Sequence, residues 1–143
     1  MDFLQLLTEC VKRSASDLHL KSGSRPILRV HGHLETQDDL PPVTRDFMRK
    51  TAMNMLGELR YNALMEGEEM DLGHTAPGIG RFRINLFLCQ GDVRAVLRHI
   101  PEHIPAFEGL HLPKVLERLS QERRGLILVT GITGSGKSTT LAA

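Results

Sequence analysis

The sequence predicts an α+β fold with a mostly antiparallel sheet over residues 1–100, followed by the start of a different domain. Three observations predict this. Some segments have apolar residues at helical spacing, and others have apolar residues at every second position, as in strands. Glycine-containing turns join the strand-like segments. A proline-rich stretch without a clear period follows, and then a continuous apolar run. We therefore predict an N-terminal domain (1–100), a linker (101–112) and the start of a second domain (113–143).

Two stretches of the N-terminal domain have the pattern of helices. Between Asp2 and Arg13, apolar residues recur three and four positions apart, which predicts an amphipathic helix. Thr44 follows the break "DDLPP" and is a good N-cap for a second helix. We expect Gly57 to stop that helix and a short further helix to run to Gly67.

The other segments of this domain alternate with the period of a strand. "SDLHL" predicts a short strand, "ILRVHGHLE" predicts a hairpin that turns at Gly32, and Met70 and Leu72 mark a strand before the turn "APGIG". "RFRINLFL" alternates throughout, with an apolar face and a face that carries Arg81 and Arg83. After a turn, "DVRAVLRHI" returns as its antiparallel partner.

The segment after the linker predicts a helix, a strand and a loop. Pro113 suits the first turn of a helix, and Gly125 is expected to end it. "LILVT" (126–130) is continuously apolar, which predicts a strand buried on both faces in a parallel sheet.

The strongest signal is the Walker A pattern G-x-x-x-x-G-K-S from Gly131 to Ser138. Its glycines let backbone N–H groups point at phosphate oxygens, and the next helix presents its positive end to the same anion. Lys137 can reach the β- and γ-phosphates of ATP, and the Ser138 hydroxyl can ligate Mg²⁺. A chance glycine-rich turn is the alternative, which the apolar run in front of the loop disfavours. The residues expected to hold the nucleotide are Gly131, Thr133, Gly134, Ser135, Gly136, Lys137, Ser138 and Thr139.

A second candidate site lies on a predicted hairpin. If Gln90-Gly91 is a two-residue turn, antiparallel pairing sets Arg83 opposite Arg98, with Arg81 on the same face. Facing like charges repel, and a phosphate would offset the repulsion because it matches the planar fork of arginine. The alternative is a solvated face on which the guanidinium groups spread into water.

Composition disfavours several other classes of protein. A hydrophobic fraction of 41% and a charged fraction of 24% are ordinary for a soluble globular chain. A net charge of +1 argues against a dedicated nucleic-acid binder. No apolar run approaches the ~20 residues of a membrane span, and the N-terminus lacks the basic region of a secretory signal.

The cysteines and histidines predict neither a disulfide nor a metal site. Cys10 and Cys89 lie far apart in apolar stretches, so we expect small buried side chains in a reducing cytoplasm. His31 and His33 flank a turn, and only His19 is near enough in sequence to be a third ligand. Zinc is therefore not expected.

Four motifs, in the same order, resemble those of one family: "ASDLHL", "GIGRFRIN", "AVLRHIP" and "RGLILVTGITGSGKSTTLAA". Together they resemble the type IV pilus retraction ATPases, the PilT-like proteins of the secretion ATPase superfamily, over essentially the whole chain. The resemblance implies a PAS-like N-terminal domain, a flexible linker and a RecA-like ATPase domain, of which this chain holds the first strand and the P-loop.

The resemblance also implies a function. Family members form homo-hexameric rings in the cytoplasm, at the inner-membrane base of the pilus, where they hydrolyse ATP and drive pilus retraction with the platform protein and the pilus machinery. Arginines of the N-terminal domain approach the nucleotide phosphates in such rings. The matching positions are Arg81, Arg83 and Arg98.

Two features depart from the family pattern. Ile132 replaces a proline common in its Walker loop, at a position whose side chain need not touch phosphate. The acidic box with the catalytic glutamate, the Walker B segment and the His box belong after Ala143. We therefore expect the full-length protein to be an ATPase, and these 143 residues alone to be inactive and to hold no catalytic residue.

Two alternatives stay open at this point. One is a non-catalytic assembly or regulatory module that uses the PAS-like domain for protein contacts. The other is an assembly ATPase of type II secretion or pilus extension. Such ATPases usually carry a longer region before the "SDLHL"-like motif, which here begins almost at the start, so the sequence favours retraction.

Overall fold

The computed structural model describes residues 2–101, 106–132 and 135–143. These residues form two compact units, one that ends at Pro101 and one that comprises the described residues after it. None of the helices in these ranges has the length and apolar character of a membrane span. Each unit is described by itself below.

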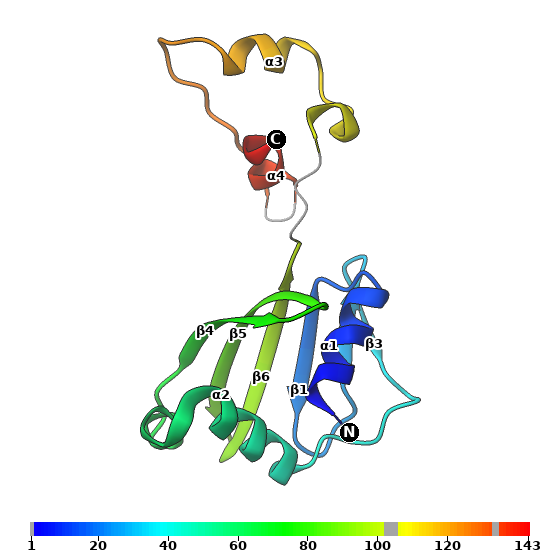
Figure 1. Cartoon of the computed structure of the whole chain (residues 1–143), viewed down its shortest axis with the longest axis vertical. Coiled ribbons are helices and arrows are strands. Elements are labelled where there is room, and N and C mark those ends of the chain that lie inside the picture. The colour runs from blue at the N-terminus through cyan, green and yellow to red at the C-terminus, as the bar shows by residue number, and fades with distance from the viewer. Residues whose placement is uncertain (1, 102–105, 133–134) are drawn as a thin grey trace. The chain divides into compact units, whose positions relative to one another are not determined.

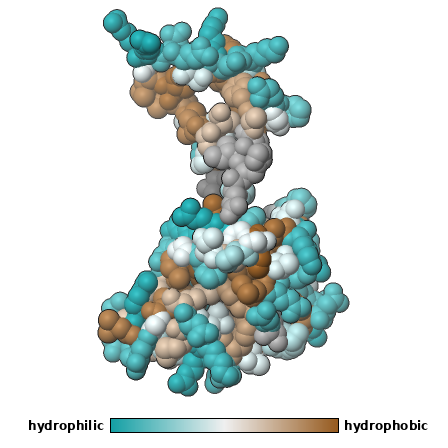
Figure 2. Space-filling model, in the orientation of Figure 1, coloured by the Kyte–Doolittle hydropathy of each residue, from teal (hydrophilic) through white to brown (hydrophobic). Residues whose placement is uncertain are grey.

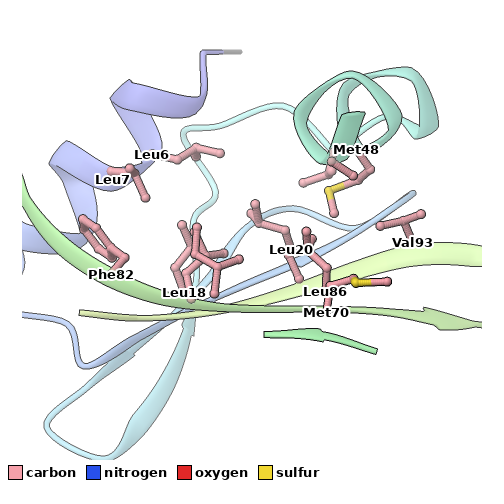
Figure 3. Packing of buried hydrophobic residues seen from close by; sticks show 14 of the residues in the cluster. Leu6, Leu7, Leu18, Leu20, Met48, Met70, Phe82, Leu86 and Val93 are labelled. Carbon is pink, nitrogen blue, oxygen red and sulfur yellow. The ribbon is translucent and has the colours of Figure 1, made fainter. Parts of the chain in front are cut away.

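The N-terminal unit is a six-stranded sheet with two helices packed on one face (Figures 1 and 3). The strands are β1 (Asp17–Lys21), β2 (Ile27–Val30), β3 (His33–Thr36), β4 (Met70–Ala76), β5 (Gly80–Cys89) and β6 (Asp92–Ile100). Their order across the sheet is β3-β2-β1-β6-β5-β4, and all neighbours are antiparallel. The predicted α+β fold with an antiparallel sheet is therefore confirmed, as is the hairpin that turns at Gly32.

Both predicted helices of this unit are present. Helix α1 (Phe3–Lys12) buries the apolar face that its spacing predicts. Helix α2 (Arg45–Met65) begins after Thr44, whose side chain accepts a hydrogen bond from the backbone N–H of Phe47 at 3.1 Å. This bond satisfies one of the donors that a helix N-terminus leaves free, as expected of a threonine N-cap.

Gly57 interrupts α2, although it does not end the helical element. Its backbone has φ 72° and ψ 171°, outside the helical region, and helical residues continue on the other side to Met65. Glycine adopts a positive φ without the steric cost that a Cβ brings. The predicted break and the short further helix are both present, and the two segments are joined by a kink.

The core lies between the two helices and the sheet. Figure 3 shows Leu6 and Leu7 of α1 and Met48 of α2 pointing at side chains of β1 and β5. Period-two alternation explains the strand side of this core, since every second residue faces the helices. The predicted apolar face of β5 is buried accordingly at Phe82, Ile84 and Leu86.

The C-terminal unit contains short helices: η1 (Phe107–Leu110), α3 (Val115–Ser120) and α4 (Lys137–Ala142). The helix predicted to begin near Pro113 is present as α3, but it ends at Ser120 and not just before Gly125. After it, the backbone N–H groups of Gln121 and Glu122 donate to carbonyls three residues earlier, in the tighter pattern of a 3-10 turn, and the α-helix ends. An exposed six-residue helix has little packing to extend it.

The strand predicted at 126–130 is wrong for this structure. These residues have no regular secondary structure, and Leu126 and Leu128 are 82% and 74% exposed. Apolar atoms of this unit accordingly lie open at its surface in Figure 2. A strand of a parallel sheet needs neighbouring strands for its backbone bonds and its two apolar faces. The described residues of this unit supply none.

Candidate functional site

The face of the sheet that points away from α1 and α2 carries a line of charged side chains. Arg29 of β2, Asp17 of β1, Arg98 of β6 and Arg83 of β5 are successive cross-strand neighbours. Asp71 of β4 lies next to Arg83, diagonally across the last strand pair. We call these five residues the charged row. Strand alternation places them together, because their neighbours in sequence point into the core.

Asp17 is the best-buried member of the charged row, with only 6% of its surface exposed. Its Oδ1 accepts a hydrogen bond from Nε of Arg98 at 3.0 Å, and its Oδ2 lies 3.5 Å from Nε of Arg29. The hydroxyl of Ser16 donates to Oδ2 at 2.8 Å. A buried carboxylate needs such partners, because leaving it unpaired would be strongly destabilising.

Arg83 holds the other carboxylate of the charged row in a forked arrangement. Its Nε lies 3.0 Å from both oxygens of Asp71, and its Nη2 also donates to Oδ2. The hydrogen bonds from Arg83 hold the pKa of Asp71 below its ordinary value. The pair is open to solvent, so we expect it to stabilise the fold only weakly.

The predicted pairing of Arg83 with Arg98 is confirmed by the register of β5 and β6. The charge repulsion between them, however, is already offset within the sheet, because each arginine has an aspartate partner. Sequence reasoning missed Asp17 and Asp71, although both stand on the polar phase of predicted strands. Arg81 is exposed on the same face and makes no ion pair with the residues that the structure describes.

A surface hollow lies over the centre of the charged row. Its volume is about 260 Å³. The residues that line it are Asp17, Asp71, Arg83, Asn85, Val96 and Arg98. Across the strands the two guanidinium groups lie side by side with a carboxylate on either side of the pair, so an anion that enters the hollow meets donors and acceptors together. The anion can be bound only by N–H donors of the arginines that the aspartates do not already occupy.

The described Walker A residues of the second unit lie immediately before α4 and in its first turn. Gly131 and Gly136 have φ of 150° and 87°, conformations that favour glycine, and α4 begins directly at Lys137. Nζ of Lys137 donates to the carbonyl oxygens of Gly131 and Ile132 at 2.7 and 2.6 Å. The lysine thus folds back over its own loop.

The nucleotide-binding assignment stays a prediction for this loop. Ser138 and Thr139 lie in the first turn of α4, where a hydroxyl can ligate Mg²⁺ and backbone N–H groups are free of helical partners. Two of the predicted residues, Thr133 and Gly134, lie outside the described residues. Lys137 satisfies its ammonium with loop carbonyls, and a phosphate would have to replace these partners.

A family model described as "Type II/IV secretion system protein" matches residues 2–143. Among curated relatives, the chain is 40% identical to the type IV pilus retraction ATPase PilT of Pseudomonas aeruginosa, over all 143 residues and 41% of the relative. It is 36% identical to the pilus ATPase PilU of the same organism, over 37% of the relative. The type II secretion system protein E of Klebsiella pneumoniae is 30% identical over 96% of the chain.

Solved structures give the same result. The crystal structure of the pilus retraction motor PilT with bound ADP has a TM-score of 0.81 and 38% identity, and covers 99% of this chain. The ATPase DotB of Legionella pneumophila has a TM-score of 0.83 and 26% identity, over 98% of this chain. The chain spans 41% and 40% of these two proteins. It belongs to the type II/IV secretion system protein family and is similar, within that family, to the PilT-like ATPases.

Proposed function

We propose that this chain is the N-terminal part of a homo-hexameric, ATP-hydrolysing motor that powers type IV pilus retraction and twitching motility. The observation that carries the proposal is the 40% identity with a pilus retraction ATPase over all 143 residues, a span that contains both candidate sites. Identity to a type II secretion protein E is 30%, which favours the retraction function over an assembly function.

In this proposal the Walker A loop binds ATP with Mg²⁺. Lys137 gives up the carbonyls of Gly131 and Ile132 and pairs with the β- and γ-phosphates, so that its ammonium neutralises their charge. The Ser138 hydroxyl ligates the metal ion, and the N–H groups at the start of α4 bind phosphate oxygens. The groups that activate water are supplied by parts of the protein beyond this chain, so the 143 residues alone do not turn over ATP.

Arg83 and Arg98 act in this proposal as phosphate sensors of the ring, with Arg81 beside them. Their side chains are 65% and 66% exposed, so their donors can be reached from solvent. Among the described residues, Arg98 contacts Asp17 through Nε alone, which leaves its terminal Nη groups open to an anion. The motor would work in the cytoplasm at the inner-membrane base of the pilus, together with the platform protein and the pilus machinery.

The test uses the full-length protein and measures ATP turnover together with twitching. Lys137→Ala should abolish both, and Arg83→Ala or Arg98→Ala should lower turnover while the protein still folds and assembles. Arg45→Ala is the matched control, because it breaks an exposed arginine–aspartate pair (2.8 Å, with Asp92) at the start of α2.

Three outcomes would contradict parts of the proposal. Unchanged ATP turnover in both Arg83→Ala and Arg98→Ala would show that the charged row is only a solvated face of the sheet. Normal twitching without the protein, combined with failed secretion, would favour an assembly ATPase. Hydrolysis by the 143-residue chain that Lys137→Ala removes would show that the chain needs no further groups.

A further inference from the structure

We propose that Asp71 masks the sensor arginine Arg83, so that a polyphosphate must displace this carboxylate, whereas Asp17 keeps Arg98 anchored and leaves its terminal Nη groups to the polyphosphate. The inference rests on the proposed function and concerns the regulation of the same site. Arg83 and Arg98 are the groups that would touch phosphate, whereas the two aspartates act through them and are positioning residues.

The geometry of Arg83 is the first support. The Asp71 carboxylate occupies its Nε and its Nη2, which form one of the edges along which a guanidinium binds a carboxylate or phosphate in a fork. A phosphate that takes the same edge must displace Asp71. The repulsion between the carboxylate and a polyanion adds to the cost of binding while Asp71 remains close.

The two pairs differ in how firmly the carboxylate is held. The Asp71 side chain is 44% exposed, and Arg83 alone holds it among the described residues, so water can take over its hydrogen bonds. Asp17 is buried and is held by Arg98, Arg29 and Ser16 together. Arg83 can therefore exchange its partner completely.

Arg98 responds differently because Asp17 cannot easily be left without donors. It keeps its Nε bond to Asp17 at 3.0 Å and can offer only the terminal Nη groups to a phosphate. The charged row thus has one arginine that changes partners and one that stays anchored. Removing the Asp71 charge should raise the affinity of the row for polyphosphate, an effect that structural damage would not produce.

The experiment titrates the 143-residue chain with tripolyphosphate and follows the arginine Nε–H signals by NMR. A Lys137→Ala background weakens competition by the Walker A loop for the probe. In Asp71→Asn, the Arg83 signal should shift at a tripolyphosphate concentration about threefold lower than in the parent chain. This factor corresponds to the loss of one exposed ion pair. Asp46→Asn is the control, because it removes the same charge from an exposed pair with Lys50 (2.8 Å) on α2.

Each outcome has a distinct meaning. A gain in affinity in Asp71→Asn, absent in Asp46→Asn, supports masking. Shifts at the same concentration in the parent chain and in Asp71→Asn overturn masking but leave phosphate sensing in place. If no arginine signal moves in any variant, both masking and the sensor part of the proposed function fail. Asp17→Asn, where it folds, should release the Nε–H of Arg98 to faster exchange with water.

Discussion

Replacing Gly80 by alanine should destabilise the N-terminal unit strongly, although the change adds a single methyl group. Gly80 opens β5 with φ 149°, a conformation that residues with a Cβ rarely adopt. A Cβ at this position would lie 3.1 Å from Nε2 of His99 and 3.9 Å from Cγ2 of Val11. The site is therefore constrained both by its backbone and by its neighbours.

The two constraints set the expected magnitude. A residue held in a sparsely populated backbone region costs about 1–3 kcal/mol. Displacing the His99 side chain adds roughly 1 kcal/mol to this destabilisation. Alanine also lowers the conformational entropy of the unfolded chain, which offsets about 0.4–1 kcal/mol of the destabilisation. Together these figures lower the free energy of unfolding by about 1–3.6 kcal/mol, and a central value of about 2.3 kcal/mol lowers Tm by roughly 10–20 °C in a domain of this size.

Thermal unfolding followed by circular dichroism tests this, with Gly73→Ala as the matched control. Gly73 also lies in the β4–β5 pair, but it has no positive φ, and no heavy atom beyond its chain neighbours lies within 4 Å of an added Cβ. Gly73→Ala should change Tm little, since alanine fits there. Equal melting temperatures for the two variants would refute the reasoning, because they would show that neither strain nor contact at Gly80 matters.

Four further predictions concern single groups. Burial raises the pKa of Cys10 to about 11, so the free energy of unfolding should fall as pH rises above 9.0, where the unfolded thiol ionises first. Alkylation of Cys10 followed by mass spectrometry should also be slower than that of half-buried Cys89, and equal rates would contradict its burial. Arg83→Ala should return the lowered pKa of Asp71 toward 3.8, which an NMR titration of the carboxylate would show. A carboxyl with a lowered pKa stabilises the fold at pH values above 3.8 and loses this contribution as the pH falls, so the variant should lose less stability in acid than the parent chain. Thr44→Ala should cost about 1 kcal/mol in urea unfolding by removing the N-cap of α2, and an unchanged midpoint would mean that water replaces the cap.

The features predicted well from the sequence are those that neighbouring residues determine. Alternation in β5 identifies its buried face, and a two-residue turn fixes which residues of β5 and β6 face each other. The facing of Arg83 and Arg98 was therefore predictable from one short segment. Gly57 was also identified correctly, because only its own backbone conformation is involved.

The features missed depend on segments far apart in the sequence. Asp17 meets Arg98 only because β1 lies beside β6, and 81 positions separate the two residues. No local pattern reports that adjacency, so the aspartates of the charged row could not be assigned to their arginines. The prediction of a strand at 126–130 was wrong for a related reason. A continuously apolar segment forms a strand when other strands lie on both sides of it, and such neighbours come from distant parts of a sequence.

The strand order has a consequence for how the N-terminal unit folds. It divides the sheet into two three-stranded meanders, β1-β2-β3 and β4-β5-β6, whose strands are joined by short turns. Within the described sheet the meanders meet along β1 and β6, and the chain between these two strands must close into a long loop before they can pair. Contacts of such long sequence separation slow folding, so this seam should form late. The bond between Asp17 and Arg98 crosses the seam, and a half-folded domain therefore cannot present an anchored Arg98 to any phosphate.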